Sequence, residues 1–136
     1  MLFEKKKIVA VDDSGIVLKM LIKVLGEKYD LHAFSGGRRA LQFLRDRTPD
    51  LIILDIDMPE INGYEMLQMI KEREHLKNVP VIFLTSNNDK SHVVKAVAGG
   101  AKDYVVKPID EEILMDKVHA ALQDAEANDA ISWNNI

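Results

Sequence analysis

The sequence predicts an α/β protein with a five-stranded parallel sheet and helices on both faces. Three observations lead to this prediction. Short apolar runs alternate with segments of helical periodicity, the alternation repeats five times, and each connection between runs is long enough to hold a helix. Parallel strands joined by right-handed crossovers form such a doubly wound sheet, and 136 residues are enough for one domain with a buried core.

The first two couplets are expected to form one inner strand and one edge strand. Residues 8–11 are an apolar run that is too short for a helix and rich in β-branched residues, which predicts a buried strand. Helical spacing then runs from Ser14, which is placed to cap the helix, to about Glu27. Residues 31–34 alternate polar and apolar side chains as an edge strand does, and the helix after Gly36 carries Ala40, Leu41 and Leu44.

The other three couplets complete the predicted sheet. Residues 51–54 form the most apolar run, which predicts a central strand, and the helix after it carries Met66, Leu67 and Ile70. Residues 80–85 and 104–106 predict the last two strands, and between them lies a helix with Val93, Val94 and Val97. The final helix is expected over residues 110–123. We therefore predict a domain at 1–123, followed at 124–136 by a tail, helix extension, linker or disordered segment.

Composition excludes several classes of function. The formal net charge of −4 is opposite in sign to a surface that tracks phosphates, so no direct nucleic-acid contact is expected. The chain has no cysteine, which excludes disulfides, thiolate nucleophiles and sulfur-ligated zinc. No segment approaches the roughly 20 apolar residues that a membrane span needs. We expect a cytoplasmic protein that does not contact the membrane.

The conspicuous polar residues follow the predicted strands. Asp12 and Asp13 end the first strand, Asp55 the third, Thr85 the fourth and Lys107 the fifth. Because ligands of such sheets bind beyond the carboxyl ends of the strands, these side chains are expected to share one site. Gathered carboxylates favour a hard divalent cation, Mg²⁺ first and Mn²⁺ as a substitute. A lysine and a hydroxyl beside them match the charge of a transferring phosphoryl group.

At these positions the chain resembles the receiver domains of two-component signalling. The resemblance covers about residues 6–123 and consists of an Asp-Asp pair, an Asp-Ile-Asp-Met-Pro segment with a glycine after it, a threonine and a Lys-Pro pair. Those elements are Asp12-Asp13, residues 55–59 with Gly63, Thr85 and Lys107-Pro108. The resemblance implies a flavodoxin-like fold with the strand order 2-1-3-4-5.

The resemblance also implies a role for each site residue. Asp55 would be the phosphoacceptor, supplied by a sensor histidine kinase or a phosphotransfer protein, and Lys107 would contact first Asp55 and then the phosphoryl oxygens. Mg²⁺ would be held by Asp12, Asp13, Asp55 and the backbone carbonyl of Asp57. The bond between Lys107 and Pro108 would be cis.

Further implications concern switching and output. Thr85 would move toward the phosphoryl group and Tyr104 would follow it, while Asp57 and Asn87 would influence how fast the phosphoryl group hydrolyses. The chain would not be an enzyme beyond its own phosphorylation and dephosphorylation. It would act on a downstream effector protein or domain. A homodimer through the fourth helix, fifth strand and fifth helix is an additional option.

Single site residues also have simpler structural interpretations. Asp12 and Asp13 would then stabilise the positive end of a helix, Thr85 and Lys107 would be an ordinary strand residue and a strand-ending lysine, and Tyr104 would pack beside the fifth strand.

Two other functions compete with the receiver function. Residues 55–57 are similar to the Asp-x-Asp motif of haloacid-dehalogenase-like phosphatases, which would use Asp55 and Asp57. In those chains, however, the motif follows the first strand. The second competitor is a phosphorylation-independent docking module of the same fold.

Overall fold

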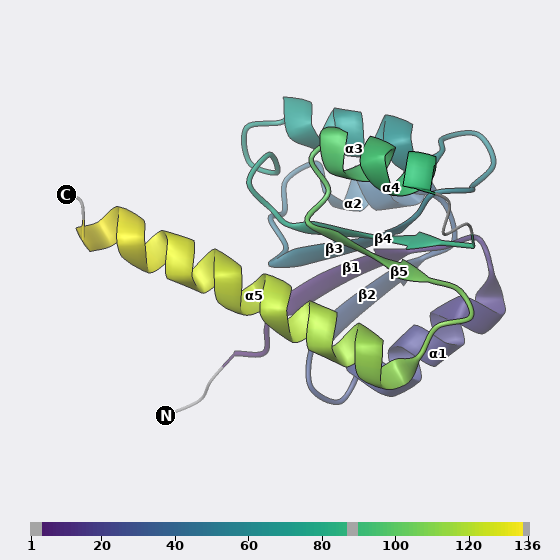
Figure 1. Ribbon diagram of the computed structural model, residues 1–136, viewed down its shortest axis with the longest axis horizontal. Coiled ribbons are helices and arrows are strands. Elements are labelled where there is room, and N and C mark those ends of the chain that lie inside the picture. Colours follow the sequence, from purple (N-terminus) through teal and green to yellow (C-terminus); the bar gives the residue numbers. More distant parts are fainter. Residues whose placement is uncertain (1–3, 87–89, 135–136) are drawn as a thin grey trace.

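The chain folds into one five-stranded parallel sheet between two layers of helices (Figure 1). The computed structural model describes residues 4–86 and 90–134. The strands are β1 (Lys7–Val11), β2 (Asp30–Phe34), β3 (Leu51–Asp55), β4 (Val81–Thr85) and β5 (Asp103–Val106). The helices are α1 (Gly15–Leu25), α2 (Gly37–Phe43), α3 (Gly63–Glu72), α4 (Lys90–Ala98) and α5 (Glu111–Asn134). The order β2-β1-β3-β4-β5 confirms the predicted fold class, with β2 at an edge and β3 in the centre.

Each face of the sheet has its own hydrophobic core. Because successive strand residues point to opposite faces, Val9 and Val11 of β1 join the core under α2, α3 and α4, while Ile8 and Ala10 join the core under α1 and α5. All five residues of β3 are buried. Because the strand is covered on both faces, its sequence is a continuous apolar run, and this run allowed the central strand to be predicted from the sequence.

Local capping sets where two of the helices begin. Ser14 caps α1, as predicted, because its hydroxyl oxygen accepts a hydrogen bond from the backbone N–H of Val17 at 3.4 Å. At α3, Asn62 accepts from the backbone N–H of Glu65, and the Glu65 carboxylate accepts in return from the backbone N–H of Asn62. Both caps lie next to loops that leave the carboxyl ends of strands, so they position those loops.

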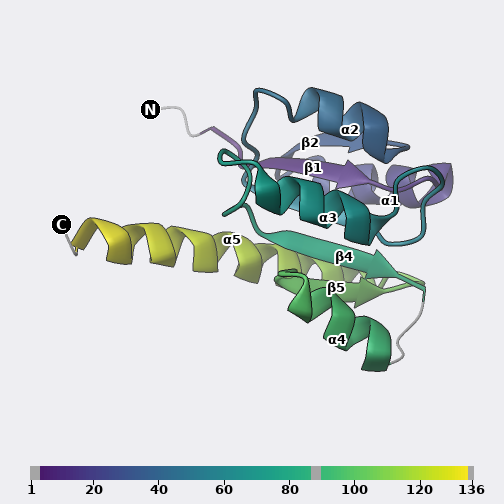
Figure 2. The same ribbon diagram turned by 90° about the horizontal axis from the view of Figure 1, so that it is seen from above.

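Helix α5 is longer than the sequence pattern predicted. The apolar pattern predicted a helix over residues 110–123, with a helix extension as one of the options for the tail; the helix continues to Asn134 and spans 24 residues (Figure 2). Residues 124–134 lack the apolar periodicity that a helix packed on the sheet shows. They can still form a helix, because the segment contains neither glycine nor proline. Two ion pairs of 2.9 Å, Lys6 with Glu126 and Lys102 with Asp124, link the helix to the domain where it leaves the sheet.

The length and hydropathy of the helices bear on whether any of them could cross a membrane. Among the described residues, none of them combines the length with the apolar character that crossing a bilayer requires.

Candidate functional site

Three carboxylates gather at the carboxyl ends of β1 and β3. Asp12 and Asp13 directly follow β1, and Asp55 is the last residue of β3, the neighbouring strand. One ligand oxygen from each lies within 4.8 Å of the others, which is close enough for all three to contact one metal ion. Asp12 and Asp55 are buried, whereas Asp13 is exposed. The predicted meeting of these side chains is therefore present in the structure.

Lys107 brings a positive charge to the two buried carboxylates. Its Nζ lies 2.8 Å from Asp12 Oδ2 and 3.4 Å from Asp55 Oδ1. The resemblance implied a pair with Asp55, but the shorter contact is with Asp12. The side chain is 21% exposed, so it is largely withdrawn from water beside two carboxylates that are more buried still. A single ammonium group thus faces two negative charges in a region of low dielectric.

The oxygens of Asp12 and Asp55 are only partly satisfied by hydrogen bonds. Asp12 Oδ1 accepts from the backbone N–H of Ser14 at 2.8 Å, and Asp55 Oδ1 accepts from that of Asp57 at 3.3 Å. Asp12 Oδ2 is buried, and although the Lys107 ammonium is near, no group in the described part of the chain meets hydrogen-bond geometry with this oxygen. A buried carboxylate oxygen with this unmet capacity is the kind of atom that binds a cation.

Crowding of negative charge perturbs the titration of the site. Burial, and then the charge of Asp12, raise the pKa of Asp55 to about 6, while Lys107 opposes the shift. Burial by itself would lower the pKa of Lys107, but the adjacent carboxylate of Asp12, reinforced by that of Asp55, raises it overall. The donor set therefore carries excess negative charge, and the three carboxylates could bind a metal ion.

The loop after β3 depends on a glycine. The backbone N–H of Gly63 donates to Ile56 O at 2.8 Å, which folds the loop back onto the end of the strand. A Cβ atom at this position would lie 2.5 Å from Asp55 O and 2.7 Å from Ile56 Cα. These are backbone atoms that cannot move aside, so only glycine fits. Gly63 thereby fixes the backbone of Asp55.

The remaining predicted site residues lie on β4 and β5. Thr85 is buried at the end of β4, and its carbonyl accepts a hydrogen bond of 2.7 Å from the backbone N–H of Lys107. The bond between Lys107 and Pro108 is cis. Phe83 pairs with Tyr104, and Thr85 pairs with Val106, so Thr85 and Tyr104 lie diagonally on the same face of the sheet. Asp57 is exposed beside the site, and Asn87 lies outside the described residues.

Sequence reasoning missed two residues around Tyr104. Lys117 of α5 contacts Asp103 and Tyr104, with its Nζ 3.1 Å from Asp103 Oδ1 and 4.6 Å from the centroid of the Tyr104 ring. Neither residue belongs to the motifs that the sequence displays. Their contact depends on how a helix passes the edge of the sheet, and no local spacing encodes that.

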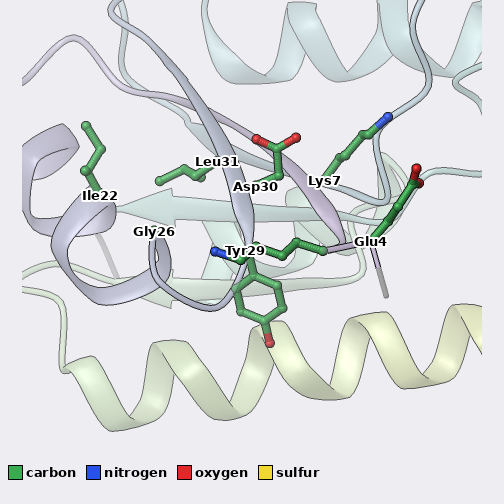
Figure 3. A pocket seen from close by; sticks show the side chains of 8 residues that line it. Glu4, Lys7, Ile22, Gly26, Tyr29, Asp30 and Leu31 are labelled. Carbon is green, nitrogen blue, oxygen red and sulfur yellow. The ribbon is translucent and has the colours of Figure 1, made fainter. Parts of the chain in front are cut away.

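A separate pocket lies at the opposite end of the sheet. It has a volume of about 550 Å³ and is lined by residues from the start of β1, the end of α1 and the start of β2 (Figure 3). Its charged residues include both signs, with Lys7 near Asp30, and the ring of Tyr29 extends from it toward α5. Because the charges are mixed and the three clustered carboxylates lie at the other ends of the strands, this pocket is not part of the acidic site.

Comparisons with known proteins agree with the fold. The family model described as the response regulator receiver domain matches residues 8–119. The chain is 36% identical over 128 residues to a probable cyclic di-GMP phosphodiesterase of Vibrio cholerae, and this match covers 94% of the chain but 29% of that protein. It is 32% identical over 127 residues to the transcriptional regulatory protein AfsQ1 of Streptomyces coelicolor, covering 92% of the chain and 55% of that protein.

Solved structures share the whole fold. The chemotaxis protein CheY4 of Vibrio cholerae superposes with a TM-score of 0.82 at 28% identity, over 86% of this chain and 98% of that one. The match thus spans nearly all of that solved chain, whereas it spans about half or less of the two curated relatives.

Proposed function

The chain belongs to the response regulator receiver family, and we propose that Asp55 is the residue that accepts the phosphoryl group. The observation that carries the assignment is the position of its carboxylate, buried at the end of the central strand between Asp12, Asp13 and the Lys107 ammonium. Asp12 is held by shorter contacts, 2.8 Å from both the Ser14 N–H and the Lys107 ammonium, whereas the corresponding contacts of Asp55 are 3.3 and 3.4 Å. Asp13 is exposed to water.

In the transfer step a carboxylate oxygen of Asp55 forms a bond to phosphorus as the bond from phosphorus to the donor nitrogen breaks. The donor is a phosphohistidine on a sensor histidine kinase or a phosphotransfer protein, and its imidazole leaves with the electron pair of the broken bond. Asp55 must be ionised to attack, and Lys107 favours that form because it lowers the pKa that burial raises. The product is an aspartyl phosphate.

Lys107 holds the reacting groups in place. Its ammonium contacts Asp12 and Asp55 before transfer, and we propose that it contacts phosphoryl oxygens afterwards. The backbone hydrogen bond from Lys107 to Thr85 ties the position of this charge to the end of β4. Thr85 can thus donate a hydrogen bond to the same phosphoryl group from the neighbouring strand.

The donor set fits a hard divalent cation, and we propose Mg²⁺, with Mn²⁺ as a substitute. Asp12, Asp13 and Asp55 would hold it, together with the backbone carbonyl of Asp57. The three clustered carboxylates and the raised pKa of Asp55 support this choice, since a single ammonium group compensates only part of their negative charge. When bound, the ion neutralises charge that builds up on the phosphoryl oxygens.

Switching is proposed to follow from the placement of Thr85 and Tyr104 on one face of the sheet. When the Thr85 hydroxyl turns toward the phosphoryl group, it vacates space that the Tyr104 ring, its diagonal neighbour, can enter. The exposed carboxylate of Asp57 is proposed to influence the lifetime of the phosphoryl group, as is Asn87. The chain acts catalytically only on its own phosphorylation and dephosphorylation.

Output is proposed to pass to a downstream effector protein or domain, because the chain spans only part of its curated relatives. We also propose the α4–β5–α5 face as the surface of a homodimer. Val94 and Val97 of α4 are 66% and 61% exposed there, which leaves apolar surface to cover. The side chain of Val93 lies outside the described part of the chain.

Intact-mass analysis with acetyl phosphate and Mg²⁺ tests the acceptor. The wild type should gain the mass of one phosphoryl group, and Asp55→Asn should gain none. Asp57→Asn is the matched control, because it removes a carboxylate two residues away and should still be labelled. Labelling of Asp55→Asn would refute the assignment, and no labelling of the wild type would favour a phosphorylation-independent docking module.

The phosphatase alternative is not favoured, because residues 55–57 follow the third strand of the sheet and the receiver family model covers the site. A turnover assay with a phosphomonoester separates the two functions. Sustained release of phosphate in excess of the protein would favour the phosphatase, whereas a receiver should release none.

A further inference from the structure

Lys117 of α5 makes three contacts around Tyr104. Its Nζ lies 3.1 Å from Asp103 Oδ1, donates a hydrogen bond to the backbone carbonyl of Tyr104, and lies 4.6 Å from the centroid of the Tyr104 ring. Asp103 Oδ1 also accepts a hydrogen bond of 2.7 Å from the backbone N–H of Tyr104. A single ammonium group therefore binds both the backbone and the ring of one residue.

These contacts pass around the edge of the sheet. The Tyr104 ring packs on the core under α2, α3 and α4, whereas Leu114 and Val118 of α5 belong to the core on the opposite face. Because β5 is the outermost strand, a side chain from α5 can reach past it to the other face (Figure 1). Lys117 is thus a direct link between α5 and a ring on the far side of the sheet.

The three contacts respond differently to a movement of the ring. The contacts with Asp103 and with the Tyr104 carbonyl involve the start and the backbone of β5, which hydrogen bonds to β4 hold in place. The cation–π contact depends on the position of the ring, and such contacts lose their energy when the cation lies beyond about 6 Å from the centroid. The ring contact is therefore the one that a change at Tyr104 would break.

We propose that Lys117 is a positioning residue that holds the Tyr104 ring in the place seen here and so couples that ring to α5. The proposal rests on the proposed function, in which Tyr104 follows Thr85 after phosphorylation. A cation–π contact of this kind corresponds to about a twofold to fivefold change in the equilibrium between two ring positions. Removing the Lys117 ammonium should therefore shift the Tyr104 ring toward its other position by the same twofold to fivefold factor.

The test is ¹⁹F NMR on the full chain with 3-fluorotyrosine at its three tyrosines. The Tyr104→Phe variant assigns the resonance of Tyr104, and beryllofluoride with Mg²⁺ mimics the phosphorylated state. Lys117→Met removes the charge but keeps an unbranched apolar side chain, and Lys117→Arg keeps a cation that can lie over the ring. Lys117→Gln replaces Lys117→Met if that variant does not fold.

A matched control exists in the same molecule. Lys95 Nζ of α4 lies 4.4 Å from the centroid of the Tyr64 ring, so Lys95→Met removes a cation–π contact of similar geometry at a different tyrosine. That variant should move the Tyr64 resonance and leave the Tyr104 resonance at its wild-type position. A general effect of losing a lysine would move both.

The expected result is that Lys117→Met moves the Tyr104 resonance, without beryllofluoride, part of the way toward its position in beryllofluoride-treated wild type. Lys117→Arg should restore the wild-type position, and Lys117→Met should bind beryllofluoride about twofold to fivefold more tightly. A wild-type resonance that moves with beryllofluoride but does not respond to Lys117→Met would overturn the proposal. A wild-type resonance that does not move, although Asp55 is labelled, would instead refute the switch at Tyr104.

Discussion

The ammonium group of Lys107 lies closer to Asp12, at 2.8 Å, than to Asp55, at 3.4 Å. The charge that neutralises the acceptor site is therefore directed mainly at a carboxylate that does not react. Asp55 is compensated less closely, and burial together with the charge of Asp12 raises its pKa. This arrangement has consequences for stability that can be measured without any phosphoryl donor.

Asp55→Asn should stabilise the protein in the absence of divalent cations, and the gain should depend on pH. The folded protein binds a proton at Asp55 with a pKa of about 6, whereas an unfolded aspartate has a pKa of about 3.9, so ionised Asp55 opposes folding. That penalty is complete above about pH 6 and absent below about pH 4. We expect a gain of about 1–3 kcal/mol in the free energy of unfolding at pH 8 and little gain at pH 4.

Urea denaturation with EDTA at both pH values measures this difference. Asp57→Asn is the control, because Asp57 is exposed and its charge is solvated. An equal gain for Asp55→Asn at pH 8 and pH 4 would show that the ionisation of Asp55 is not the cause.

Mg²⁺ should raise the melting temperature of the wild type, since a ligand that binds only the folded state stabilises it by mass action. Asp12→Asn and Asp13→Asn should each require at least about tenfold more Mg²⁺ for the same rise, because each removes one oxygen donor from the cluster. Thermal melts at increasing Mg²⁺ concentration give the apparent affinities. Asp46→Asn, at an exposed residue in the loop after α2, should behave as wild type; the same loss there would mean non-specific ion binding.

Lys107→Met should destabilise the metal-free protein at pH 8 by about 1–3 kcal/mol, because it leaves two buried carboxylates without their cation. It should also raise the pKa of Asp55 further, since Lys107 is the group that lowers it. In a double-mutant cycle, Asp55→Asn should recover more stability in the Lys107→Met background than in the wild type. Additive effects would indicate that Lys107 and Asp55 do not interact.

Gly63→Ala should destabilise the protein by about 2–4 kcal/mol, because the added Cβ meets backbone atoms of Asp55 and Ile56 that cannot yield. Gly15→Ala is the matched control, since nothing lies within 4 Å of its Cβ position and it sits in the first turn of α1. That change should be neutral or slightly stabilising. Urea denaturation measures both, and equal stabilities would mean that the loop after β3 can shift without cost.

Several features of the fold could be predicted because they are local. The buried strands β1 and β3 are short continuous apolar runs, which the sequence displays directly. The cap at Ser14 depends only on the residues that follow it. Asp12 and Asp55 could be expected to meet because parallel strands end at the same edge of a sheet, whatever the details of packing.

Other features could be decided only by the folded structure. The preference of Lys107 for Asp12 over Asp55 depends on differences of less than an ångström, which no spacing along the chain encodes. The contact between Lys117 and Tyr104 requires a helix on one face of the sheet to pass an edge strand closely enough for a side chain to reach round it. Periodicity determined which elements form and where the strand ends lie, because it is a property of neighbouring residues. Distances between charges on separate elements were decided by packing, because only packing brings those elements together.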